Sequence, residues 1–179
     1  MVKVPALMII LGSPASGKTT LARQLAVDLH VPCLCKDDIK EALFETLGTG
    51  EREWSRRLSE ASFGAMAALA GVQIAAGLCC IVEGNWRAAH PADLFARVNR
   101  HGARTAQVCC RAEPEEIARR FTARQRHAGH LDGVLGDELR QAGESAPTFM
   151  ELPGPRWVYA SDSPAAYPGL LQGLKSWGL

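Results

Sequence analysis

The stretch GSPASGKTT, Gly12 to Thr20, follows directly on the apolar run ALMIIL and precedes a segment with leucines at helical spacing. It matches the pattern G-x-x-x-x-G-K-[ST] in full, and strand, loop and helix stand in the order that the pattern requires. Gly12 and Gly17 permit backbone turns that side chains would block, so the loop N–H groups and the helix N-terminus converge on an anion. The stretch therefore predicts a phosphate-binding loop with a nucleoside triphosphate as its ligand.

Two side chains of this loop have specific expected roles. The Lys18 ammonium reaches the β and γ phosphates, and the Thr19 hydroxyl is a ligand of Mg²⁺. The expected cofactors are therefore ATP and Mg²⁺. The residues expected to bind the nucleotide are Gly12, Ser13, Ala15, Ser16, Gly17, Lys18, Thr19 and Thr20.

Apolar runs of strand length alternate with helical patterns along the whole chain. The predicted strands cover 5–11, 32–36, 78–83, 104–111 and 156–160, and the predicted helices cover 18–29, 38–47, 53–76, 91–101, 113–126 and 164–177. Such alternation indicates a parallel sheet covered on both faces. We therefore expect a single domain over residues 1–179 with a three-layer αβα P-loop NTPase fold, a five-stranded parallel sheet and a helical lid at about 115–135.

The overall composition argues against strongly charged partners. The net charge is +1, so no strong field favours nucleic acid or an anionic membrane. The six cysteines lie in apolar stretches, which predicts reduced core thiols in a cytoplasmic protein. Residues 63–82 are long and apolar enough to span a bilayer. Because they are rich in Ala and Gly and end in the β-type run LCCIV, we expect a helix followed by a buried strand and no membrane contact.

Two adjacent aspartates follow the second predicted strand, in the stretch KDDIKEAL. Asp38 and Glu41 have the acid-x-x-Glu spacing of a capping box, so Asp38 is predicted to cap a helix that begins there. Asp37 lies at the carboxyl end of the strand, where parallel sheets bind their ligands. Its carboxylate can accept a proton from an attacking hydroxyl or help to hold the metal through water. The alternative is that Asp37 is itself the cap, or is merely solvated.

An acid also ends the third predicted strand, CCIVE. Four apolar residues followed by Glu83 are typical of the second nucleotide motif, whose acid orients Mg²⁺ or a catalytic water. An exposed strand-end charge is the alternative. Asn85, in the turn that follows, can contact the acceptor, although Asn is also common in turns for conformational reasons.

The stretch EEIARRFTARQRHAGHLD, residues 115–132, places several arginines on a helix that runs into a Gly-containing loop. Arg120 and Arg124 are four residues apart and share one helix face. Such a helix can close over the phosphates as a lid and stabilise charge on the transferred group. The alternative is a solvated basic face. His127 and His130 could also suggest a metal site, although a loop histidine pair more often faces solvent or substrate.

These motifs together resemble a known family. GSPASGKTT, CKDDIKEAL, IVEGNW and ARRFTARQRHAGHLD occur in the order found in small P-loop kinases related to chloramphenicol phosphotransferase, the kinase domain of polynucleotide kinase and zeta toxins. The resemblance covers residues 5–135 and implies that ATP with Mg²⁺ phosphorylates a hydroxyl. It also implies that Asp37 is the base, that Lys40 matches a basic residue after the aspartate pair, and that Arg120 and Arg124 are lid arginines.

The expected function is that of an ATP-dependent phosphotransferase, a kinase that moves the γ-phosphate to a hydroxyl of a small molecule such as an antibiotic or a sugar-like metabolite. The expected catalytic residues are Asp37, Lys18, Arg120 and Arg124; the expected substrate contacts are Asp37, Lys40, Glu83 and Asn85; and the expected metal contacts are Thr19 and, through water, Glu83.

Two alternatives to this function stay open at the level of sequence. One is a regulatory or binding P-loop ATPase with no dedicated small acceptor. A carboxylate aimed at an acceptor hydroxyl, as expected of Asp37, has no use in such a protein. The other is a nucleic-acid 5′-hydroxyl kinase, which would need a basic balance for phosphate contacts that this chain lacks.

Overall fold

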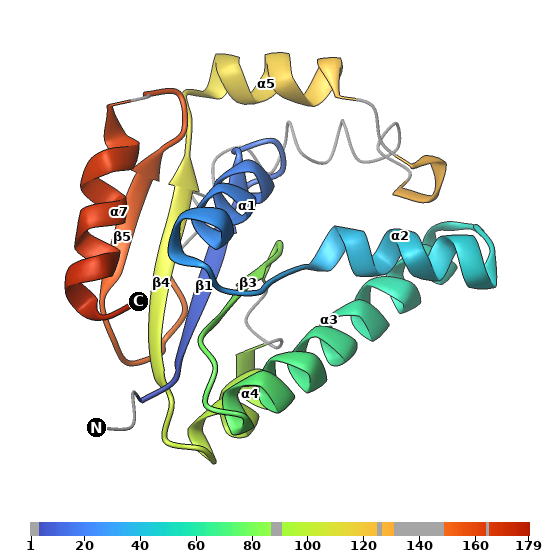
Figure 1. Ribbon diagram of the computed structural model, residues 1–179. Coiled ribbons are helices and arrows are strands. Elements are labelled where there is room, and N and C mark those ends of the chain that lie inside the picture. The colour runs from blue at the N-terminus through green and yellow to red at the C-terminus, as the bar shows by residue number, and fades with distance from the viewer. Residues whose placement is uncertain (1–3, 87–90, 125–126, 131–148, 164) are drawn as a thin grey trace.

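Five strands form one parallel sheet in the part of the chain that this computed structural model describes, residues 4–86, 91–124, 127–130, 149–163 and 165–179 (Figure 1). The strands are β1 (Ala6–Gly12), β2 (Cys33–Cys35), β3 (Cys80–Glu83), β4 (Arg104–Arg111) and β5 (Arg156–Ala160). Their order across the sheet is β2-β3-β1-β4-β5, so the chain reverses direction of winding next to the central strand β1. All neighbouring pairs are parallel, as the alternating pattern predicts.

The described helices cover both faces of the sheet. They are α1 (Lys18–Leu29), α2 (Lys36–Leu47), α3 (Arg52–Ala75), α4 (Pro91–Asn99), α5 (Pro114–Ala123) and α7 (Ala166–Trp177), with the short 3₁₀ helix η1 (Ala128–His130). On β1, Leu7 and Ile9 point into a core shared with α3 and α4, whereas Met8 and Ile10 point into a core shared with α1 and α7. The predicted three-layer αβα architecture is confirmed.

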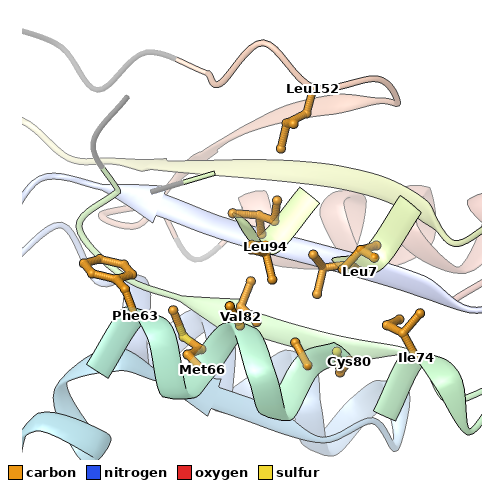
Figure 2. Packing of buried hydrophobic residues seen from close by; sticks show 12 residues of the cluster. Leu7, Phe63, Met66, Ile74, Cys80, Val82, Leu94 and Leu152 are labelled. Atoms are coloured by element: carbon orange, nitrogen blue, oxygen red, sulfur yellow. The ribbon is translucent and has the colours of Figure 1, made fainter. Parts of the chain in front are cut away.

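The core beneath α3 accounts for the apolar stretch that is long enough to span a membrane. By length and composition α3 passes that test, but so does the core helix of a globular domain. Figure 2 shows Phe63, Met66 and Ile74 of α3 packed against Leu7 and Val82 of the sheet. The helix therefore serves as a cover of the sheet, and the cysteine-rich run after it forms the buried strand β3, as expected.

One departure from the predicted boundaries is at the start of α2. This helix begins at Lys36, two residues before the predicted 38, because the chain passes from β2 into α2 without a loop. Cys35 is both the last residue of the strand and the N-cap, with an extended backbone (φ −95°, ψ 125°) and no side-chain cap. The prediction that Asp38 caps the helix is therefore wrong. Asp37 and Asp38 both lie in the first turn, where carboxylates complement the helix dipole.

The segment predicted as a lid, 115–135, is described only in part. α5 ends at Ala123 and η1 covers Ala128–His130, whereas residues 125–126 and 131–135 lie outside the described residues. α5 lies across the end of the sheet at which β1 and β4 finish (Figure 1).

Candidate active site

The parallel sheet brings the predicted site residues to one edge. The register aligns Ile10 of β1 and Cys35 of β2 with Glu83 of β3. Three neighbouring strands therefore carry the site at their carboxyl ends: β1 leads into the phosphate-binding loop, β2 leads into the first turn of α2, and β3 ends at Glu83. This edge is where doubly wound sheets bind ligands.

The backbone of the loop requires glycine at both ends. Gly12 has φ +152°, and a Cβ there would lie 2.6 Å from the carbonyl oxygen of Cys110. Gly17, with φ +85°, caps α1, and a Cβ there would lie 3.0 Å from Cβ of Ser161. Ala15 adopts a positive φ of 62° between them. With this backbone the loop places its N–H groups at the N-terminus of α1, which is the arrangement that binds phosphate.

Lys18 bridges the loop from within. Its Nζ donates a hydrogen bond to the carbonyl oxygen of Ser13 at 2.9 Å, and the residue is 9% exposed. Burial lowers the pKa of Lys18, and the negative charges of Glu83 and Asp37 oppose that shift. The positive charge of Arg124 adds to the lowering of this pKa. The predicted base and one predicted lid arginine thus both lie within electrostatic reach of the phosphate-binding lysine.

Glu83 is held between Lys18 and Thr19. Thr19 Oγ1 donates to Oε2 of Glu83 at 3.1 Å, and Lys18 Nζ lies 3.9 Å from Oε1. Glu83 is 4% exposed, and burial raises its pKa, while Lys18 and the Thr19 hydrogen bond act in the opposite direction. A hydroxyl oxygen beside a carboxylate at a phosphate site is the donor set that Mg²⁺ prefers. The residues present therefore fit the predicted metal.

Asp37 has a partner that the sequence analysis missed. Nζ of the buried Lys36 lies 3.0 Å from Oδ1 of Asp37, whose side chain is 40% exposed. The ion pair joins a buried cation to a carboxylate that still faces outward. The sequence signal for Lys36 was its position directly after an apolar strand. A lysine at that position can be buried when it has a charged partner.

Asp38 points elsewhere. Nη2 of Arg23, on α1, lies 2.8 Å and 3.0 Å from the two carboxylate oxygens of Asp38. Both side chains are more than half exposed, so the pair ties α2 to α1 at the surface. The two adjacent aspartates thus have different surroundings: Asp37 lies toward the phosphate-binding loop and Asp38 toward solvent.

Arg120 is fixed beside the phosphate-binding loop. Its Nε donates to Glu116 at 2.6 Å, its Nη1 donates to Ser161 Oγ at 2.8 Å, and its Nη2 donates to Ser161 O at 3.2 Å. A Cβ on Gly17 would lie 3.5 Å from Nη1 of Arg120. The residue that follows β5 therefore orients a guanidinium over the start of α1.

Lys40 is not brought to the centre of this arrangement. Nζ of Lys40 is buried and donates to Ser55 Oγ at 2.8 Å, which in turn donates to the carbonyl oxygen of Gly129 at 2.9 Å. The same ammonium lies 5.0 Å from the ring centroid of Phe44. Asn85 is exposed in the turn after β3. Lys40 therefore joins α2, α3 and η1.

The two histidines of the lid segment pair with carboxylates of α2. His127 Nε2 lies 3.0 Å from Glu45 and His130 Nε2 lies 2.8 Å from Glu41, while both rings pack on Phe44. Within the described residues no group of three or more His, Cys, Asp or Glu side chains could hold a metal ion. These histidines serve to dock η1 on α2.

Comparison with known proteins identifies the family of the chain. The family model described as an AAA domain matches residues 7–143. The chain belongs to the AAA-domain family. No curated protein is significantly similar to it in sequence.

Solved structures extend the comparison of this AAA-domain protein to nearly the whole chain. A proposed kinase from Chloroflexus aurantiacus is 28% identical with a TM-score of 0.88, covering 97% of this chain and 98% of that one. Kti12 from Chaetomium thermophilum, solved with ADP-AlF3, is 15% identical with a TM-score of 0.68, covering 95% and 97%. The APS kinase of Mycobacterium tuberculosis, solved with AMPPNP and APS, is 16% identical with a TM-score of 0.59, covering 96% of each chain. The fold is that of a P-loop kinase-like domain.

Proposed function

We propose that this protein is an ATP-dependent kinase that transfers the γ-phosphate to a hydroxyl group of a small molecule. The observation that carries the proposal is the position of Asp37. Its carboxylate is paired with the buried Lys36, remains partly exposed, and lies close enough to Lys18 for its charge to oppose the lowering of the Lys18 pKa by burial. A phosphate-binding loop alone serves many P-loop proteins. A carboxylate beside it, open to an acceptor, suits a hydroxyl nucleophile.

The described residues divide the reaction between them. The loop N–H groups and Lys18 hold the β and γ phosphates. Asp37 accepts the proton of the acceptor hydroxyl. The oxygen of that hydroxyl bonds to the γ-phosphorus as the bond from this phosphorus to the bridging oxygen of ADP breaks. Arg120 and Arg124 complement the negative charge that builds on the transferred group and on the leaving ADP.

Thr19 and Glu83 would hold Mg²⁺, Thr19 directly and Glu83 through water. The ion would neutralise charge on the β and γ phosphate oxygens. The hydrogen bond between the two side chains keeps both oxygens together at the head of α1.

We also propose that the segment 115–135 acts as a lid. Arg120 and Arg124 lie near the phosphate-binding loop, and the contacts of His127 and His130 attach the described residues 127–130 to α2. A segment fastened both to Ser161 and to the helix that carries Asp37 can close over nucleotide and acceptor together.

The class of acceptor is supported by charge and by structural neighbours. A net charge of +1 offers little for nucleic-acid phosphates, which favours a small molecule over a 5′-hydroxyl polynucleotide. Among the neighbours, one is named as a sugar kinase and another as an APS kinase. All six cysteines are free thiols, consistent with the proposed cytoplasmic location.

Incubation with γ-labelled ATP, Mg²⁺ and a panel of hydroxylated sugars, nucleosides and antibiotics tests the proposal. We expect label to pass to at least one acceptor in the parent protein and not in a folded Lys18→Ala variant. Release of ADP and free phosphate alone, with every acceptor, would instead support the regulatory ATPase.

A further inference from the structure

Cys33 and Cys35 place two thiols side by side on the edge strand β2. They are two residues apart in an extended strand, so their side chains point to the same face. Their sulfur atoms are 3.7 Å apart. Cys33 is half-buried and Cys35 is buried, so one thiol of the pair is open to small reagents and the other lies behind it.

The surroundings favour reaction at Cys33. The hydrogen bond from the Cys35 thiol lowers the pKa of Cys33, and the positive charge of Arg23 acts in the same direction. Burial and the carboxylates of Glu83 and Asp38 oppose this shift of the Cys33 pKa. A partly exposed thiol with thiolate character beside a second thiol is the arrangement that peroxides oxidise selectively.

The pair is also directly joined to the candidate active site. Cys35 is the N-cap of α2, followed immediately by Lys36 and Asp37. Across the sheet, Cys35 is in register with Glu83. A change of backbone at β2 would therefore move Asp37 relative to the phosphate-binding loop.

We propose that Cys33 and Cys35 form a reversible disulfide on exposure to a hydroperoxide, and that this bond switches off phosphotransfer. The inhibition rests on the proposed function, whereas the disulfide itself does not. First, the Cys33 thiolate attacks the peroxide: an S–O bond forms, the O–O bond breaks, and the departing oxygen takes a proton to give an alcohol or water. Then the Cys35 sulfur attacks the sulfenic acid of Cys33. The S–S bond forms, the S–O bond breaks, and the hydroxyl leaves as water with the Cys35 proton.

Formation of this bond distorts the strand. An S–S bond of about 2.05 Å requires the sulfurs to approach by about 1.6 Å from their separation of 3.7 Å. Residues two apart in a strand have Cα atoms about 6.6–6.8 Å apart, at the upper end of the range that disulfides tolerate. Because disulfides most often hold Cα atoms about 5.5–6 Å apart, we expect the oxidised strand to contract, and a strained bond of this kind is readily reduced again by thiols. Displacement of a catalytic group by about 1 Å can lower turnover by roughly 10²-fold.

The test treats the parent protein, Cys33→Ser, Cys35→Ser and a control, Cys79→Ser, with a small molar excess of hydrogen peroxide. Intact mass and peptide mapping identify the products, and turnover of ATP with the acceptor is measured before oxidation, after it, and after reduction with dithiothreitol. We expect the parent and the Cys79→Ser control to lose two hydrogen atoms, to yield a peptide linked through Cys33 and Cys35, and to lose turnover by roughly 10–100-fold until reduced. The Cys33→Ser and Cys35→Ser proteins should stay active and form no such bond.

Each other result decides against part of the proposal. A linkage through Cys79 or Cys80, or accumulation of sulfinic acid at Cys33 without a linked peptide, would overturn the disulfide. A linked Cys33–Cys35 peptide with unchanged turnover would overturn the switch. If the reduced parent transfers no phosphate at all, the proposed function fails, and peptide mapping alone still decides the disulfide.

Discussion

The hydroxyl of Thr19 donates a hydrogen bond to Glu83 at 3.1 Å, although the two residues come from different elements, the head of α1 and the end of β3. The contact joins the two oxygen donors that a phosphate-bound Mg²⁺ would need. It also gives the buried Glu83 carboxylate a hydrogen-bond partner, and an unpaired carboxylate there would be costly.

The first prediction concerns this contact and the metal. Replacing Thr19 by Ala removes one oxygen donor and should raise the Mg²⁺ concentration needed for half-maximal turnover. Thr19→Ser keeps the hydroxyl and should behave nearly as the parent. Initial rates measured over a range of Mg²⁺ at saturating ATP give the comparison. A Thr19→Ala curve superimposable on the parent curve would remove Thr19 from the metal site.

The second prediction concerns the stability of the Lys18–Glu83 pair. Burial raises the pKa of Glu83 and lowers that of Lys18, so both charges oppose folding at neutral pH. Replacing Lys18 by Met and Glu83 by Gln should therefore abolish turnover yet increase the free energy of unfolding.

The pH dependence of that gain has a defined sign. A raised carboxylate pKa makes ionisation of Glu83 unfavourable in the folded protein, and this cost appears as the pH rises above the unfolded pKa and through the folded one. The stability advantage of the double variant should thus be larger at neutral pH than near pH 4, as followed by urea denaturation. An equal advantage at both pH values would show that Glu83 contributes none of it.

The third prediction separates catalysis from binding at Arg120. This guanidinium is oriented by Glu116 and by Ser161. Arg120→Ala should lower kcat more than it weakens ATP binding, because charge on the transferred group is greatest in the transition state. Ser161→Ala should be milder, since the Ser161 carbonyl still accepts a hydrogen bond. Calorimetric ATP affinity and steady-state kinetics of both variants test this; an Arg120→Ala protein with weaker ATP binding and unchanged kcat would make Arg120 a binding residue only.

The fourth prediction concerns the docking of η1 on α2. A Cβ on Gly129 would lie 2.7 Å from the ring of Phe44, which is 2% exposed and packed between two histidines. Gly129→Ala should therefore destabilise the protein by about 1–3 kcal/mol, the scale for overpacking a core. Adding Phe44→Leu should recover part of this loss, because the smaller side chain leaves room. Thermal unfolding of the single and double variants measures both effects, and additive losses would contradict the proposed clash.

Much of the fold was predictable because its strongest signals are local. The phosphate-binding loop fixes where β1 ends and α1 begins, and the predicted α1, β4 and β5 match the observed bounds. Uninterrupted apolar runs and leucines at helical spacing identify buried strands and covering helices whatever their neighbours are.

The start of α2 could not be predicted from the same signals. The acid-x-x-Glu pattern at Asp38 is a sound helix-start signal, but the chain enters α2 directly from β2, so tertiary packing places the first turn at Lys36. The role of Ser161 depends on a contact with Arg120 that only the folded chain brings about, and the burial of Lys36 depends on how the elements pack. Lys40 is the opposite case. The motif match predicted a substrate contact for it, but its ammonium donates to Ser55 in the interior.

Comparison of Asp37→Asn with Asp38→Asn tests the central claim most directly. The variants are isosteric, adjacent and equally conservative, and calorimetry should show that both still bind ATP. With γ-labelled ATP and an accepted hydroxyl substrate, we expect Asp37→Asn to lose roughly 10²–10⁴-fold in phosphotransfer, the scale for removal of a positioned general base. Asp38→Asn removes only an exposed ion pair with Arg23 and should keep nearly all activity. Full phosphotransfer by a folded Asp37→Asn protein would contradict the account.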